Sequence, residues 1–305
     1  MGLVKNTPQS RKKQVENLTS YLNKTHPRPA KTVSLLNQSN VNLHTIEPSS
    51  TESLITKPSD LQHAIAHIKD NMWRSTELLS SEKLKVSTEH FRSALPNIVL
   101  KSQLTGLYRF NPTLLEKELF KACQDAKIRI ILINNGLGGS VIIENEYFYD
   151  LLQRTLQKEY PELYDAFNSL LRENPATTSF TQDELQAATI SQESERILVN
   201  AGFLTLCNTT SQDKTFTVCI PNLGSLLKII KQARKWVVDS LRQSKNKSTL
   251  SEVNLQSRWV HSKDFWVKNK GLDLSWILLD CYGGGYCNKF MSPTGLHWKL
   301  SGKSY

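Results

Sequence analysis

Along this chain, apolar residues with helical spacing repeatedly give way to two short β-type segments joined by a turn. In the clearest case, Asn111 and Pro112 begin a helical segment, and the strands IRIILI (128–133) and SVII (140–143) flank the turn NNGLGG. Helix–helix–helix–strand–strand is the order of the winged helix, a helix-turn-helix variant with a β-wing. The pattern therefore predicts an α+β fold that is mainly helical and contains three tandem winged-helix units.

The second repeat has well-defined helix ends. Thr181 and Glu184 have capping-box spacing, Ser191 precedes a further helical segment, and Gly202 is expected at the end of that segment. The strands expected after it are FLTLC (203–207) and TFTVCI (215–220).

The third repeat is weaker. A long helix is expected over 223–245, followed by helices near 249–256 and 262–270. A final hairpin is expected from WILLDC (276–281) and LHWKL (296–300), with YGGGYCNKFMSPTG between them as an insertion-like loop of unknown role. The expected boundaries are 85–158, 159–221 and 222–305.

Residues 1–84 are rich in Ser, Thr, Asn, Gln, Lys and Pro, a composition that predicts a mostly disordered, basic region. One helix is expected there, as an accessory or transient element, or alternatively as a partner-binding helix. Its apolar face consists of Leu61, Ala64, Ile65, Ile68 and Met72.

Eight of the chain's ten net positive charges lie between Asn222 and Lys270, where eleven Lys and Arg accompany three acids. Clustered cations release condensed counterions when they meet phosphates, so such a bias indicates a polyanion partner. The simpler alternative is a solvated helix face, but that would more often mix the two signs.

The spacing within the long basic helix separates an apolar stripe from a charged one. The stripe consists of Leu226, Ile229, Ile230, Ala233, Val237 and Leu241. At about 100° per residue, the opposite face carries Lys228, Lys231, Lys235 and Arg242. We expect a helix that packs inward through the stripe and exposes a row of cations for phosphates.

Two tryptophans lie among further cations of this segment, and aromatic side chains there could stack on unpaired bases or serve as core anchors. Trp259 and Trp266 are accompanied by Arg258, Lys263 and Lys268, of which Arg258 and Lys263 join the predicted DNA-binding set. The third helices of the first two units carry acids instead, which predicts that those units bind proteins. These acids are Glu116, Glu118, Glu193 and Glu195.

Several classes of protein are disfavoured. No apolar run approaches the roughly 20 residues that span a bilayer, and the N-terminus lacks the apolar core of a secretory signal.

We expect buried thiols at Cys123, Cys207 and Cys219, and Cys281 could meet Cys287 across a turn. His63 and His67 share a helical face, but we expect no metal site there.

A protein kinase needs an HRD catalytic base, a DFG magnesium ligand and a VAIK-like strand, and this chain contains none of these motifs. The glycines of GLGG (136–139) fit a hairpin turn, because glycine tolerates positive φ. We therefore expect a protein without enzymatic activity, cofactor or small-molecule substrate.

Four segments resemble the family named serine/threonine-protein kinase 19. They are ALPNIVLKSQL (94–104), KIRIILI (127–133), ILVNAGFLTL (197–206) and LLDC (278–281), and the resemblance covers roughly residues 88–300. It implies three tandem winged helices that bind double-stranded DNA in the nucleus and act in transcription-coupled nucleotide excision repair beside stalled RNA polymerase II, without kinase activity. By position, the family's basic DNA-facing region falls on Lys228, Lys231, Lys235, Arg242, Lys245 and Lys247.

The expected function is that of a nuclear, non-catalytic scaffold that binds double-stranded DNA through the basic helix and contacts repair and RNA polymerase II-associated proteins. The alternative is a protein-interaction module whose basic helix meets an acidic repair or transcription subunit without direct DNA binding.

Overall fold

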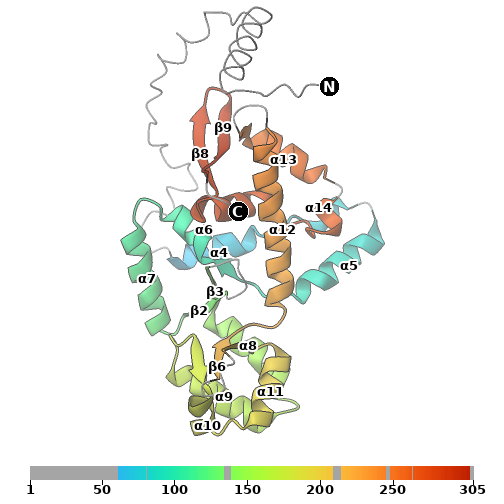
Figure 1. Ribbon diagram of the computed structural model, residues 1–305. Coiled ribbons are helices and arrows are strands. Elements are labelled where there is room, and N and C mark those ends of the chain that lie inside the picture. The colour runs from blue at the N-terminus through green and yellow to red at the C-terminus, as the bar shows by residue number, and fades with distance from the viewer. Residues whose placement is uncertain are drawn as a thin grey trace, which may run out of the picture. The chain divides into compact units, whose positions relative to one another are not determined.

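The computed structural model describes residues 61–79, 81–133, 139–208, 214–244, 248–262 and 264–302, which all belong to one compact unit, Glu47–Tyr305. Helices and small antiparallel sheets make up these residues, so the expected α+β class is confirmed (Figure 1).

The described residues contain three three-stranded sheets with the same strand order, in which the third strand in sequence lies in the middle. In each, a short first strand precedes the helices that lead to the hairpin, and it pairs with the last strand. These first strands, only two or three residues long, were not predicted. The sheets are β1 (Val99–Leu100), β3 (Ser140–Glu144) and β2 (Ile128–Leu132); β4 (Ser179–Thr181), β6 (Thr215–Val218) and β5 (Leu204–Asn208); and β7 (Thr249–Ser251), β9 (Gly295–Leu300) and β8 (Cys287–Ser292).

Each sheet and its neighbouring helices are called here the first, second and third module. The first contains α5 (Glu82–Ser93), α6 (Lys101–Leu107), α7 (Pro112–Gln124) and α8 (Asn145–Leu156). The second contains α9 (Pro161–Glu173), α10 (Gln182–Ala187) and α11 (Gln192–Ala201). The third contains α12 (Leu223–Arg242), α13 (Glu252–Val260), α14 (Asp264–Val267) and α15 (Leu274–Gly283).

The predicted helix ends of the second module are confirmed. Thr181 and Glu184 form a capping box at the start of α10, and the Ser191 hydroxyl accepts a hydrogen bond from the Ser194 amide at the start of α11. Gly202 ends α11 with φ of 85°, in the left-handed region that favours glycine. Local side-chain chemistry was sufficient to predict these positions.

The predicted final hairpin was wrong in its first strand. Residues 276–281 form most of helix α15, and the strand that pairs with β9 is β8, which lies inside the supposed insertion loop. A short, continuous apolar run fits a buried strand or a buried helix equally well. The Asp273 carboxylate favours the helix, because it accepts a hydrogen bond from the Ser275 amide at 2.7 Å.

The helix expected at 249–256 is also displaced, because residues 249–251 form strand β7 and α13 follows it. The helix expected at 262–270 is the four-residue α14. The short strand β7, between α12 and α13, therefore accounts for part of the difference.

Helix α4 (Leu61–Asp70) is part of the folded core. The five apolar residues predicted to share its face, including Ala64 and Met72, are all buried, and α4 packs against α6, α7 and β1. The interpretation as an accessory helix is therefore corrected, and the folded part extends upstream of residue 84. Residues 1–60, within the predicted disordered region, lie outside the described residues.

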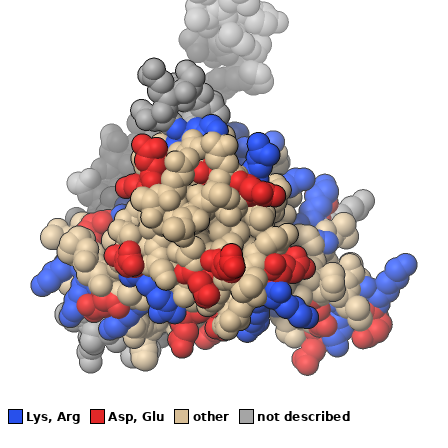
Figure 2. All heavy atoms as spheres, turned by 90° about the horizontal axis from the view of Figure 1, so that it is seen from below, with Lys and Arg blue, Asp and Glu red and all other residues tan. Residues whose placement is uncertain are grey.

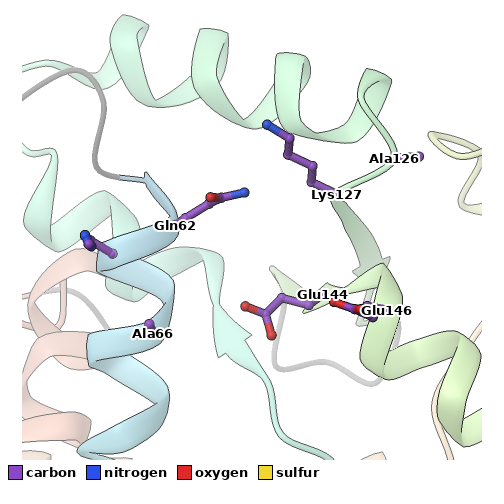
Figure 3. Close-up of a pocket in the computed structure, with 7 residues that line it drawn as sticks. Gln62, Ala66, Ala126, Lys127, Glu144 and Glu146 are labelled. Atoms are coloured by element: carbon purple, nitrogen blue, oxygen red, sulfur yellow. The ribbon is translucent and has the colours of Figure 1, made fainter.

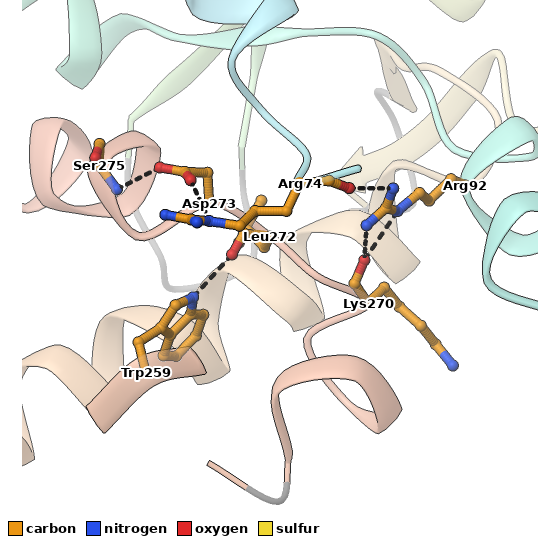
Figure 4. A network of polar contacts seen from close by, with 7 residues as sticks. All are labelled: Arg74, Arg92, Trp259, Lys270, Leu272, Asp273 and Ser275. Atoms are coloured by element: carbon orange, nitrogen blue, oxygen red, sulfur yellow. Dashed lines mark hydrogen bonds and ion pairs between the residues drawn. The ribbon is translucent and has the colours of Figure 1, made fainter. Parts of the chain in front are cut away.

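A polar network ties the segment after α4 to the third module (Figure 4). The Arg92 guanidinium of α5 donates to the carbonyl oxygens of Arg74 and Lys270, at 2.9 and 2.8 Å. Arg74 Nε in turn donates to the Asp273 carboxylate at 2.9 Å. Burial lowers the pKa of Arg92 to about 10, and the charge of Glu89 offsets part of that effect.

The closest contact between helices of different modules joins α6 and α15. A Cβ atom placed on Gly283 would come within 1.7 Å of the Ser102 carbonyl oxygen and 2.6 Å of the Gly106 amide nitrogen. The Gln103 side chain, which is fully buried, donates to the Trp276 carbonyl oxygen at 3.1 Å. The glycine-rich segment that was expected as an insertion-like loop therefore begins as a packed helix end.

A buried ion pair lies beside this contact. The Asp280 carboxylate of α15 accepts two hydrogen bonds from Arg234 of α12, at 2.5 and 2.9 Å, and one from the Ser102 hydroxyl at 2.5 Å. Arg234 is 5% exposed and Asp280 fully buried. Burial lowers the pKa of Arg234, but the charge of Asp280 and the hydrogen bonds to it outweigh burial and raise it.

We predict that Gly283→Ala destabilises the protein by about 3 kcal/mol or more, because the added methyl meets backbone atoms that cannot move aside cheaply. Gly224→Ala in α12 is the control. Nothing lies within 4 Å of its added methyl, so stability should hold or rise by up to about 1 kcal/mol. Urea unfolding followed by circular dichroism measures both, and equal free energies of unfolding would contradict the close packing of α6 and α15.

We further predict that Arg234→Met lowers the free energy of unfolding by about 3–5 kcal/mol, because it leaves the buried Asp280 carboxylate without its countercharge. Lys235→Met removes the neighbouring, exposed cation and should change stability by no more than about 0.5 kcal/mol. The same unfolding measurement compares the two variants. A loss that is similar for both, or small for Arg234→Met, would show that the pair is not a structural requirement.

Candidate nucleic-acid interface

The predicted row of cations lies on the outer face of α12. Lys228, Lys231, Lys235 and Arg242 are all exposed, whereas the six apolar residues of the predicted stripe are buried. From Lys228 to Arg242, the row extends over fourteen residue steps, or about 21 Å along the helix axis at 1.5 Å per residue. The helix therefore has the amphipathic arrangement that its sequence predicted.

Neighbouring acids screen this row only in part. Arg242 forms an ion pair with Asp239, one turn earlier, at 3.2 Å, and both side chains are more than a third exposed. Such surface pairs contribute little and yield readily to another anion. Among the described residues, Lys228 and Lys235 take part in no ion pair.

One of the eleven cations in the basic segment is not available to a ligand. Arg234 faces inward and is bound to Asp280. Lys268 on α14 is also paired, with Asp264 at 3.0 Å. The local charge that can act on a partner is therefore smaller than the sequence count suggests, and four of the six remaining described cations lie on the outer face of α12.

The remaining predicted site residues are partly described. Arg258 is exposed in the last turn of α13. Lys245, Lys247 and Lys263 lie outside the described residues.

Base stacking by Trp259 is ruled out by its position. Its ring is fully buried, its indole N–H donates to the Leu272 carbonyl oxygen at 2.8 Å, and Trp236 packs edge-on against it with ring centroids 4.8 Å apart. Trp266 is half-buried, and the Arg92 guanidinium lies 5.7 Å from its ring centroid. The core-anchor alternative is therefore correct for Trp259.

The acids of the first two modules are not equivalent. Glu116 is exposed and forms an ion pair with Lys101 at 2.9 Å, and Glu193 is exposed at the start of α11. Glu195 was counted among the acids expected to meet a partner protein, but the structure buries it to 4% exposure. Helical spacing explains this correction, because Glu195 lies three residues before the buried Leu198 and shares its side of α11.

The expected burial of the cysteines is only partly correct. Cys123 is buried, but Cys207 is exposed on β5, where the pairing with β6 shifts register. Cys281 and Cys287 are buried and close together, and none of the five cysteines is in a disulfide. A hydrogen bond with Cys287 and burial raise the pKa of Cys281 well above its ordinary value.

An open polar cavity of about 510 Å³ lies between the start of α4 and the base of the first hairpin (Figure 3). His63, Lys127 and Glu146 line it together with Glu144, which forms an ion pair with Lys69. Within the described ranges, no three His, Cys, Asp or Glu side chains are grouped as a metal site would require. The cavity therefore offers mixed, largely solvated charges and no evident catalytic arrangement.

No helix of the described residues is both long and apolar enough to cross a bilayer.

Two comparisons with known proteins show which family the chain resembles. It is 25% identical over 260 residues to a protein of Schizosaccharomyces pombe (strain 972 / ATCC 24843) named serine/threonine-protein kinase mug51, an alignment that covers 82% of this chain and 79% of that protein. The sequence profile of the Stk19 family, described as inactive serine-threonine protein kinase 19, matches residues 69–300. Because this match covers well over half of the chain, the chain belongs to the family of inactive serine-threonine protein kinase 19.

Proposed function

We propose that the protein is a nuclear, non-catalytic scaffold that binds double-stranded DNA with little sequence preference and acts in transcription-coupled repair. The observation that carries the DNA-binding part is the row of exposed cations on α12, on a helix whose opposite face is anchored in the core. The repair role and the nuclear location rest on the family resemblance.

The proposed contacts are to phosphates. Lys228, Lys231 and Lys235 lie along one helix face, so they would follow a backbone and fix the position of the protein without reading bases. Lysine suits this role, because its ammonium group is a flexible point charge and its contacts do not depend on base identity.

We further propose that the three modules are winged helices. Each has a short strand, at least two helices and a hairpin, in that order, and the short strand pairs with the last strand of the hairpin. In the third module, helix α15 before the hairpin is buried against α6, so it is not available to a DNA groove. The proposed DNA contact is therefore made by the outer face of α12, and it does not require the insertion of a helix into a DNA groove.

The proposal that the protein is not an enzyme rests on its family's description as inactive and on the missing kinase motifs. The name of the fission-yeast relative includes the word kinase, so a direct assay of phosphate transfer on purified protein is a worthwhile companion measurement.

We predict that the double variant Lys228→Glu/Lys235→Glu binds duplex DNA more weakly and with a flatter salt dependence. Each lost phosphate contact should reduce the slope of log K against log salt concentration by ~0.9, so the expected fall is ~1.8. Fluorescence anisotropy with a labelled duplex over a salt series measures this slope.

The matched control is Lys121→Glu/Lys158→Glu, which changes net charge equally at two exposed lysines of the first module. Its slope should equal that of the wild type. If both variants reduce the slope equally, binding reflects net charge alone; if neither does, α12 is not the interface.

The alternative function, binding of the α12 row to an acidic protein subunit, makes a different prediction. The wild type would then fail to retain duplex DNA at about 150 mM salt, while an acidic partner would still bind and would be lost in Lys228→Glu/Lys235→Glu.

A further inference from the structure

A second surface feature lies on the second module, on elements that the proposed DNA contact does not use. Helix α11 and the β5–β6 hairpin enclose a groove of about 340 Å³, within the range of small ligand sites. Leu206 and Phe216 are directly paired across the hairpin, so their side chains lie on the same face of it. That face and Val199 of α11 form the apolar part of the groove.

The apolar walls are open to solvent. Val199 is 36% exposed and Leu206 is 40% exposed, whereas Phe216 is only 5% exposed and forms the floor. Strand β5 shifts register against β6 directly after Leu206. Such irregularities re-aim side chains and are common beside functional sites.

The groove also contains a buried carboxylate. Glu195 lines it, is 4% exposed, and its Oε1 atom has no hydrogen-bond partner among the described residues. An unsatisfied charged group at this depth costs free energy that the fold must offset elsewhere. Burial raises the pKa of Glu195, and the charge of Lys214 at the rim offsets only part of that effect.

A purely structural role does not account for this carboxylate. Glu193 and Glu195 both lie in the first turn of α11, where the helix dipole stabilises an acid, but the dipole gives the buried Glu195 Oε1 no hydrogen-bond partner, and the Ser191 hydroxyl already binds the Ser194 amide. No described ion pair joins Glu195 to Lys214 or to Arg196, the two cations that line the groove. The buried oxygen therefore lacks a described partner within the protein, and a cation that enters the groove would supply one.

The charge of the second module fits such a partner. Residues 159–221 contain nine acids and three Lys or Arg, a net charge of −6, in contrast to the basic segment that follows. Figure 2 shows the face that is lowest in Figure 1, where α9, α10 and α11 lie, and acidic side chains are spread across it among uncharged ones, with basic side chains between them and toward the edges. A cationic ligand would be attracted to this face and DNA repelled.

We propose that the groove between α11 and the β5–β6 hairpin is a docking site for a peptide segment of a partner protein, in which a Lys or Arg side chain binds Glu195 and an adjacent apolar side chain covers Val199 and Leu206. The carboxylate would gain a charge-assisted hydrogen bond from the incoming cation, and the two exposed apolar residues would be removed from water. The rim groups of Gln192 and Asn200 offer additional polar contacts to a peptide backbone. This site is independent of the proposed DNA contact, so either can fail alone.

The test is selection of a phage-displayed library of random peptides on the full chain, followed by fluorescence polarisation with the recovered peptides. Recovered peptides should share a Lys or Arg beside an apolar residue. Glu195→Gln should weaken their binding about ten- to hundredfold, the loss expected for one buried charge-assisted hydrogen bond. Leu206→Ser, at an exposed position, should weaken binding through the apolar contact alone.

The matched control is Glu193→Gln, the same substitution at the exposed acid two residues earlier, which should leave peptide binding unchanged. Glu195→Gln should keep or raise the melting temperature, because it removes an unpaired buried charge. It should also leave the salt slope of DNA binding unchanged.

Four outcomes would overturn the proposal. These are no recovery above a protein-free selection, no enrichment of Lys or Arg, equal loss of binding in both glutamate variants, and a marked fall in the melting temperature of Glu195→Gln. Self-association of the wild type that Glu195→Gln abolishes would identify a second copy as the occupant and would likewise overturn the partner assigned here.

Discussion

The Asp280 carboxylate binds groups from two other helices, and the arrangement of the third module depends on it. It accepts hydrogen bonds from Arg234 of α12 and from Ser102 of α6, so one fully buried acid connects three helices. Because Arg234 must face this acid, the rotation of α12 about its axis is determined. Lys231 and Lys235 lie about 60° and 100° around the helix axis from Arg234, beyond the edge of the buried side, and both are exposed.

Much of this could be predicted from the sequence, because local signals dominate it. The apolar stripe of α12, the capping box at Thr181 and the αL glycine at position 202 follow from spacing and side-chain chemistry. The helix at residues 276–281 could not be predicted in this way, because its apolar residues continue around the helix and leave no polar face. Its burial against α6 depends on a contact between residues 173 positions apart, Gln103 and Trp276, which no local pattern in the sequence predicts.

The same limit applied to individual charges. A count of charged residues does not show which of them are buried. The structure places Arg234 in a buried ion pair, Lys235 on an exposed helix face and Glu195 in a groove where it is buried. The two proposed binding sites follow from these environments: the third module would bind DNA phosphates, and the second module would bind a cationic peptide. Opposite charge on neighbouring modules would keep the two ligands from competing for one surface.

The close approach of α6 and α15 at Gly106 and Gly283 has a practical consequence for dissecting the protein. A fragment that stops before the last module would expose the side of α6 that α15 covers, including the fully buried Gln103. Loss of activity in such a deletion series would report misfolding of what is left, however the ligands are distributed. Domain mapping in this family is therefore better done with surface point substitutions, which leave the shared helix pair intact.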